Sequence, residues 1–366
     1  MNQGMTLVSS FIPHPSSFFF GEGIGMAVLL QAKKSKRLST AQGVGIIIVA
    51  MIAFMVLLGA RYNFGLVDYI QFVLDGLRAG AIYALVALGF VTVYRVTGVI
   101  NFAQGAFIML GPMIAISVYQ AQWLAEPGLN LALGAVVGIA ITTIVGIGVE
   151  RFTLYPARRS LPLTKIIITI GAYLAIQGAA LLVWGPQGRV MPAFATLNLA
   201  DESLRFAGLL VKAQSLWIWG TAAVTLVILA VFFERTMLGK AMRACAVNRL
   251  AAQLMGIRVD TMSMLAFGIA AILGSVGGIV LGPVTRPTYD MGLDLGLKGF
   301  VAAIIGGLVN FPAAVIGGLM LGVLENMWAG VTQAGFKDLF AFVVLIVILL
   351  TRPSVLAGPE SEGDHE

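Results

Sequence analysis

Long apolar runs alternate with short polar connections along nearly the whole chain. A run of about 20 apolar residues can cross the roughly 30 Å hydrocarbon core of a bilayer as a helix, in which backbone polar groups are satisfied within the segment. The pattern predicts an all-α, polytopic integral membrane protein with about ten transmembrane helices. The expected spans are residues 42–60, 67–94, 101–120, 129–149, 165–184, 216–233, 262–282, 297–309, 311–328 and 338–350.

Two of these spans depart from a simple upright helix. The run 67–94 is too long, and its Asp75 and Arg78 are spaced to pair on one helix face, so we expect its first turns to lie along the membrane interface. The run 297–309 is short. Together with the next span it predicts a pair of helices broken at Asn310–Pro312, where the backbone must be covered by protein or line a cavity.

The composition excludes several classes of protein. Hydrophobic residues make up 59% of the chain and charged residues only 11%, against about 25% in an average soluble domain, so a water-soluble surface is excluded. Cys245 is the only cysteine, and His14 and His365 lie near the two ends, which excludes a disulfide scaffold and a Cys/His metal site. We expect neither a metal nor another cofactor.

The basic residues predict how the chain is oriented. The net charge of +6 lies in short tracts between spans rather than on one face, which indicates the inner side of a membrane as a partner and not nucleic acid. The positive-inside rule then makes one set of alternate connections, and both termini, cytoplasmic. That set holds fifteen of the 23 cations: Lys33, Lys34, Lys36, Arg37, Arg95, Arg151, Arg158, Arg159, Lys165, Arg235, Lys240, Arg243, Arg249, Arg258 and Arg352.

The two ends of the chain differ from the apolar middle. Residues 1–40 contain an apolar run with Glu22 and no basic stretch before it, a poor signal peptide and a poor span, so we expect a disordered leader, with Met26 as an alternative start. Residues 41–351 form the expected transmembrane permease domain. Residues 352–366 form an acidic tail, expected to be cytoplasmic and solvated.

Small residues recur at a spacing of four within the spans. In lipid, such residues allow two helices to approach closely, and we favour close packing over the alternative of surfaces adapted to sliding. The pairs and triplet are Gly134 with Gly138, Gly274 with Gly278 and Gly282, and Gly318 with Gly322.

Searches for catalytic motifs find no phosphate-binding GxxxxGK[ST], no HExxH and no GxSxG. The chain is therefore not expected to be an enzyme or to hydrolyse ATP, and a transporter, a channel or the membrane half of an energised complex remain. Buried charges are few in the predicted spans, which argues against a proton- or sodium-coupled carrier, since such carriers commonly place an acid in mid-membrane.

The polar loop 234–260 is the longest on the predicted inner side. Its composition favours a helix that ends at Gly256, and it has a small apolar face. Two interpretations stay open on the residues alone. The loop is either a solvated connector or a short helix that docks into a groove of a soluble partner.

Four segments in order resemble a known family. They are GLRAGAIYALVALGFVTVYRVTGVINFAQGAFIMLG from Gly76, LGKAMRACAVNRLAAQLMGIRVD from Leu238, FGIAAILGSVGGIVLGPV from Phe267 and KGFVAAIIGGLVNFPAAVIGGLMLGVLEN from Lys298. Over residues 67 to 350 the chain is similar to Liv-type permeases, the membrane subunits of branched-chain amino-acid ABC importers, and most of all to LivH-like subunits.

The resemblance implies an ABC-importer permease in a bacterial inner membrane, which translocates branched-chain or related amino acids. It also implies two cytoplasmic ABC ATPase subunits, a second permease that is usually a different chain, and a periplasmic substrate-binding protein. The loop would couple the permease to an ATPase. The implied coupling residues are Gly239, Arg243, Ala244, Asn248, Ala251, Ala252, Gly256 and Ile257. The alternative function is a permease or channel for urea, short amides or another small neutral solute.

Candidate residues of the translocation pathway are uncharged. We expect Asn101 and Gln104, three residues apart, to share one helix face, where amides would hydrogen-bond a passing zwitterion without retaining it. The favoured alternative is that these amides lock helices together. Tyr83 and Asn310 are weaker candidates of the same kind. The chain also departs from the family pattern at Ala106, where relatives often carry a glutamate.

Overall fold

The computed structural model describes residues 53–351 with the exception of 56, 58, 60, 125, 195–203, 207–208 and 333. The predicted leader, the acidic tail and most of the first predicted span therefore lie outside the described residues.

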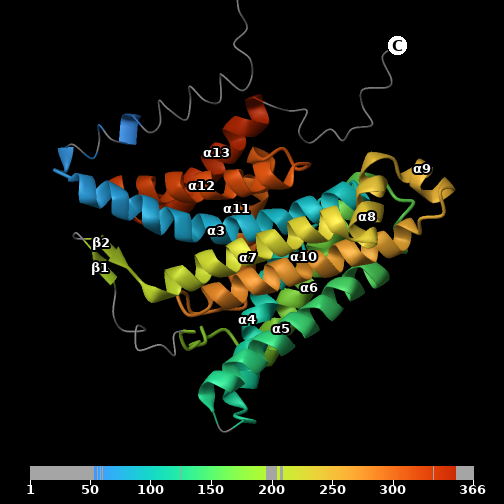
Figure 1. Cartoon of the computed structure of the whole chain (residues 1–366), viewed down its shortest axis with the longest axis horizontal. Coiled ribbons are helices and arrows are strands. Elements are labelled where there is room, and N and C mark those ends of the chain that lie inside the picture. The colour runs from blue at the N-terminus through green and yellow to red at the C-terminus, as the bar shows by residue number, and fades with distance from the viewer. Residues whose placement is uncertain are drawn as a thin grey trace, which may run out of the picture. The chain divides into compact units, whose positions relative to one another are not determined.

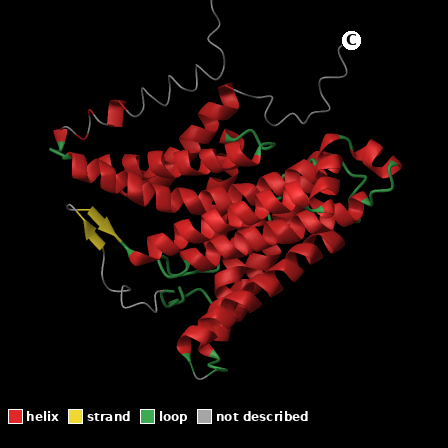
Figure 2. Cartoon of the chain, viewed as in Figure 1, coloured by secondary structure: helices red, strands yellow, loops and turns green. Residues whose placement is uncertain are grey.

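The described part of the chain is nearly all helical (Figures 1 and 2). Its β structure is one antiparallel hairpin, β1 (Leu204–Phe206) with β2 (Leu209–Val211). The helices are α3 (Leu66–Thr97), α4 (Gln104–Gln120), α5 (Pro127–Val149) continued by the π-helical turn η1 (Glu150–Leu154), α6 (Pro162–Trp184), α7 (Ala213–Arg235), α8 (Met237–Val247), α9 (Arg249–Leu254), α10 (Val259–Leu281), α11 (Met291–Ile305), α12 (Phe311–Val331), the 3-10 turn η2 (Ala334–Phe336) and α13 (Lys337–Thr351).

Six helices in the described residues are long and apolar enough to cross a membrane: α3, α5 with η1, α6, α7, α10 and α12. Three shorter helices, α4, α11 and α13, of 17, 15 and 15 residues, fall on further predicted spans. The prediction of an all-helical polytopic membrane protein is thus confirmed. The largest shift concerns α11, which begins six residues before the predicted 297.

Helix α3 is the centre of the bundle. It packs against α7, α10, α11 and α12, and most of its residues from Gly80 onward are buried. Asp75 and Arg78 form the expected ion pair, with 3.3 Å between Oδ1 and Nη2. The helix runs without interruption for 32 residues, so no break separates its first turns from the span.

The glycines spaced four apart bring helix backbones into contact, as predicted. A methyl group added to Gly322 would lie 2.3 Å from the Gly80 nitrogen, and one added to Gly278 would lie 2.0 Å from the Ile108 oxygen. Gly134 packs in the same way against Ala115 of α4. No side chain fits at these contacts, so α3 with α12 and α4 with α10 approach more closely than larger residues allow.

Two turns interrupt the helices inside the bundle. The first follows Gly98, whose φ of 68° ends α3, and α4 starts at Gln104. The second follows α11, where Gly307 has a φ of 81°, and α12 starts at Phe311. The break predicted at Asn310–Pro312 is therefore real but lies just before it. Proline stands in the first turn of α12, where its missing N–H costs no hydrogen bond.

Basic residues from several elements meet at one end of the bundle, here called the cationic end. Arg249 donates to the Thr97 carbonyl oxygen at the end of α3 (3.1 Å), and Arg158 pairs with Asp260 at the start of α10 (3.3 Å). Helices α8 and α9 lie at this end, and the β1–β2 hairpin lies near the opposite end of α7 (Figure 1). Several cations predicted to share one membrane side thus meet at one end of the fold, among them Arg151, Arg158, Lys165, Arg249 and Arg258. Lys33, Lys34, Lys36, Arg37 and Arg352 lie outside the described residues.

The contact between α3 and α12 gives a test of the packing. We expect Gly322→Val to lower the stability of the detergent-purified protein by about 1–3 kcal/mol, because the added atoms meet the Gly80 backbone. Gly171→Val on α6 is the matched control, since nothing lies within 4 Å of a methyl group there. Thermal unfolding should separate the two variants. Equal melting temperatures would show that the glycine contact does not hold the bundle.

Candidate functional site

The loop 234–260, predicted to be cytoplasmic and to couple to an ATPase, forms two short helices, α8 and α9. Helix α8 starts after Thr236, whose Oγ accepts from the Gly239 N–H at 3.0 Å. Gly239 presses against the end of α7, where a methyl group would lie 2.2 Å from the Phe232 carbonyl oxygen. Met242 and Cys245 are buried on the same face of α8. This face therefore holds α8 to the bundle and is not available to a partner.

Helix α9 is bounded by two of the predicted coupling residues. Asn248 caps its start, with Oδ1 accepting from the Ala251 N–H at 2.9 Å. Gly256 has a φ of 82° after its end, and the Ile257 N–H bonds back to the Ala252 oxygen. The prediction of a helix that ends at Gly256 therefore agrees with the structure.

The eight predicted coupling residues divide into three groups. Asn248, Ala251 and Gly256 are exposed at the cationic end. Arg243, Ala244 and Ile257 are half-buried, and Gly239 and Ala252 are buried. The first two groups are placed to touch a partner, whereas the buried pair positions the helices.

Sequence reasoning missed the most exposed apolar residues of this region. Five side chains are between 67% and 87% exposed: Met237, Val247, Leu250, Leu254 and Met255. We call this set the apolar tip. The sequence did contain a sign of this exposure, because these apolar residues stand within an otherwise polar loop. Exposed large apolar side chains that gather among polar ones are typical of interaction sites.

A chain of contacts leads from α8 to the break between α11 and α12. Gly239 packs on Phe232 and Phe233, and the Phe233 ring lies 4.7 Å from the Phe311 ring, the first residue of α12. The Arg95 guanidinium lies over the same Phe311 ring at 4.9 Å. A displacement of α8 therefore reaches the start of α12 through two packed side chains.

The two amides predicted for the pathway have structural partners. Asn101 lies in the turn before α4, where its Oδ1 accepts from the Ala103 N–H at 3.0 Å. The expectation that it shares a helix face with Gln104 is wrong, because α4 begins only at Gln104. Gln104 donates to the Ala270 oxygen of α10 at 3.0 Å and packs on Gly89 of α3. These contacts are those of a helix lock, while Gln104 Oε1 and Asn101 Nδ2 are buried without a hydrogen-bond partner within the described residues.

Asn310 is also placed differently from the expectation. Its side chain is exposed and caps α12, with Oδ1 accepting from the Ala313 N–H at 3.5 Å. The residue beside it, Phe311, carries the contact with α7. A capping role accounts for Asn310 without any contact to a solute.

A cluster of charged side chains joins α11, α12 and α13. The Lys298 ammonium lies 2.9 Å from Glu325 Oε1, 3.2 Å from Asp294 Oδ2 and 2.6 Å from Asp338 Oδ1. Lys298 is 5% and Glu325 0% exposed at the side chain, whereas the two aspartates are about half exposed. The Lys298 ammonium also lies 5.9 Å from the Tyr83 ring centre, which places Tyr83 in this cluster.

The expectation of few buried charges is corrected by this pair. Lys298 and Glu325 both fall within predicted spans, so the signal was visible in the sequence, and intramembrane charges are costly enough to be functional candidates. The pair neutralises itself, and the remaining acids face outward. Among the described residues, no group of His, Cys, Asp or Glu is placed to hold a metal ion.

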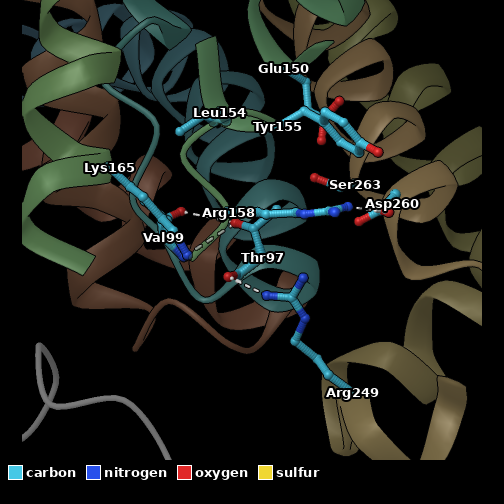
Figure 3. A pocket seen from close by; sticks show the side chains of 10 residues that line it. All are labelled: Thr97, Val99, Glu150, Leu154, Tyr155, Arg158, Lys165, Arg249, Asp260 and Ser263. Atoms are coloured by element: carbon cyan, nitrogen blue, oxygen red, sulfur yellow. Dashed lines mark hydrogen bonds and ion pairs between the residues drawn. The ribbon is translucent and has the colours of Figure 1, made fainter. Parts of the chain in front are cut away.

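A small polar niche lies at the cationic end, between the α3–α4 turn, η1 and α10 (Figure 3). Lys165 and Arg249 reach it from two sides, and Glu150 of η1 is buried beside Ser263. Tyr155 is covered by two guanidinium groups, with Arg151 at 4.3 Å and a second arginine at 4.7 Å. Contacts around the niche, such as that between Glu150 and Ser263, connect the end of α5 to α10.

These features define a multi-pass membrane protein of the transport type, with a closed ion-pair cluster inside and an exposed apolar tip at one end. A profile of the family described as "Branched-chain amino acid transport system / permease component" matches residues 72–350. The chain belongs to this family, the non-enzymatic permease components of ABC importers.

Individual relatives agree with the family. The chain is 33% identical over 301 residues to the high-affinity branched-chain amino acid transport system permease protein BraD of Pseudomonas aeruginosa, covering 80% of this chain and 97% of that protein. It is 32% identical over 302 residues to LivH of Escherichia coli, with the same coverage. Among solved structures, the chain is similar to PsaBC from Streptococcus pneumoniae in complex with Fab. The match has 13% sequence identity and a TM-score of 0.41, and it covers 81% of this chain and 95% of that chain.

The buried pair gives a test of the cluster. We expect Lys298→Met to lower stability by about 3–5 kcal/mol, because Glu325 is left buried without a cation. The double variant Lys298→Met with Glu325→Gln should recover much of this loss. Asp338→Asn is the comparison and should cost less, because that carboxylate is about half exposed and its pairing with Lys298 is screened by solvent. SDS-induced unfolding measures all three, and additive effects of the two buried changes would refute a coupled pair.

Proposed function

We propose that this chain is the permease subunit of an ATP-driven importer of branched-chain or related amino acids in a bacterial inner membrane. The cationic end and both termini face the cytoplasm. The observation that carries the proposal is the apolar tip on α8 and α9. It suits docking to a soluble cytoplasmic subunit, and the family supplies ATPases as the occupants.

Two ATPase subunits, one for each permease of a pair, are the partners that fit this arrangement. The apolar tip stands among Lys240, Arg243, Arg249 and Arg258, so its rim is basic. An apolar centre with a charged rim is the usual anatomy of a protein interface. A shallow groove of about 430 Å³ lies next to α9, between η1 and α10, and extends the surface that a partner can cover.

A second permease subunit, of a different chain as in the Liv-type importers, completes the pathway. Helices α5, α6 and α7 expose many large apolar side chains, such as Ile144, Leu182 and Val227. These faces are available to lipid and to a second permease alike.

A periplasmic binding protein delivers the amino acid at the end opposite the cationic one, near the β1–β2 hairpin.

ATP binding is transmitted through α8 and shifts the permease between two states, each open to a different side of the membrane. ATP binding closes the ATPase pair, α8 and α9 follow, and the contact of Phe233 with Phe311 carries the displacement to α12. Moving a two-state equilibrium from 1:99 to 99:1 requires about 5.5 kcal/mol of differential binding, and nucleotide binding supplies energy on this scale.

Transport by the assembled complex tests the substrate class. We expect proteoliposomes with the complete complex and its binding protein to accumulate radiolabelled leucine only with ATP. Urea uptake should match that of empty liposomes. Urea uptake by this chain alone, without ATP, would instead support the alternative of a channel or carrier for small neutral solutes.

The apolar tip gives a test of the ATPase contact. We expect Leu254→Glu to lower ATP-dependent uptake at least about tenfold, because a central apolar contact of an interface commonly contributes about 2 kcal/mol or more. The ATPase subunits should be lost on purification while the permease stays inserted. Leu129→Glu is the matched control, an exposed leucine in the first turn of α5. Retention of the ATPases by the Leu254 variant would place the contact elsewhere.

A further inference from the structure

A pocket of about 190 Å³ lies between α4, α6 and α11, and neither the coupling helices nor the charged cluster accounts for it. Phe90 and Phe102 form one wall, and the Phe300 ring packs against both in a tilted arrangement, with ring centres 5.6 and 5.3 Å away. Ile170 and Leu293 form the partly exposed rim. No charged side chain lines the pocket, so its walls suit an apolar group.

The pocket lies about halfway along the spans. Gln104, at the start of α4, bonds to Ala270 in the middle of α10. Ile170 and Tyr173 lie near the middle of α6. A solute held here would be far from both membrane surfaces.

Two helices begin beside the pocket. Gly105 and Gly292 stand in the first turns of α4 and α11 and touch, since a methyl group on either would lie 2.4 Å from the other's carbonyl oxygen. The first N–H groups of a helix lack partners within it and carry the positive end of its dipole. Neither helix start has a side-chain cap. Part of this polar backbone is already bonded, since the Gln104, Ala106 and Leu293 N–H groups each donate to the carbonyl oxygen three residues earlier. The polar backbone that lines the otherwise apolar space is that of Gly105 and Gly292.

Tyr173 supplies the second polar feature. Its side chain lines the pocket, the residue is 3% exposed, and its hydroxyl makes no hydrogen bond of normal geometry within the described residues. The Leu293 backbone and the Asp290 carboxylate lie near this hydroxyl. A buried hydroxyl without a partner costs folding free energy, so its presence points to a ligand.

We infer that this pocket is the intramembrane binding site for the transported amino acid. The branched aliphatic side chain lies against Phe90 and Phe102, and the charged end lies at Tyr173 and the starts of α4 and α11. The inference rests on the proposed function, since it takes the substrate class from there. Without an ion pair in the lining, the site is weak enough to release its solute, as conduction requires.

The lining distinguishes an aliphatic amino acid from urea. Urea has no apolar group, so the polar end of the pocket is the only part that it could use and the apolar walls stabilise it little. An aliphatic side chain gains from the same walls in proportion to the area removed from water.

Cysteine protection in the complete complex tests the site. Ile170→Cys places a thiol on the rim, and the native Cys245 gives little background, because it is buried and burial raises the pKa of its thiol. We expect leucine at about ten times its dissociation constant to slow labelling of this thiol by N-ethylmaleimide roughly tenfold. Leu174→Cys is the control, a more exposed position on α6 outside the pocket, and leucine should not protect it.

Tyr173→Phe in the Ile170→Cys background tests the polar end. The labelling rate without leucine should stay the same, whereas the leucine concentration that gives half protection should rise about two- to tenfold. Absence of protection at position 170, or equal protection at position 174, in a complex that still imports leucine would overturn the pocket and leave the proposed function intact. A complex with the unsubstituted permease that does not import leucine at all would instead refute the proposed function.

Discussion

A backbone amide inside a hydrocarbon layer must find its hydrogen-bond partner within the protein, and this constraint decides where the chain can leave a helix. The two internal turns satisfy it locally. The Gln104 N–H bonds to the Asn101 oxygen after α3, and the Leu308 N–H bonds to the Ala303 oxygen after α11. Asn101 and Leu308 are themselves buried, whereas Gly98, Val309 and Asn310 in the same turns are exposed.

The same turns place the two features that matter for transport. The turn after α3 lets α4 begin halfway across the bundle, beside the pocket. The turn after α11 brings Phe311 against the end of α7, beside the coupling helices. The helices are thus interrupted at two places, one beside the pocket and one beside the coupling helices.

The sequence predicted those parts of the structure that depend on local pattern. Spans, the glycine contacts and the helical coupling loop follow from hydropathy, spacing and composition over short windows. Asn101 was assigned to a helix because hydropathy cannot distinguish an apolar turn from an apolar helix. The pairing of Lys298 with Glu325, the exposure of Leu254 and the approach of Tyr173 to Gly292 depend on which distant segments meet, and no local pattern encodes that.

Helix α11 connects the coupling route with the pocket. Its first turn touches Gly105 at the pocket. Its last turn lies about 22 Å further along the helix, at 1.5 Å per residue over 15 residues, and leads through the turn to Phe311. Lys298 in its middle is paired with Glu325 and Asp338, so α11 is held to α12 and α13. A buried pair of this kind resists separation, because parting it leaves two uncompensated charges. Under the proposed coupling, a displacement at Phe311 therefore moves α11 with its neighbours and changes the pocket between α4, α6 and α11.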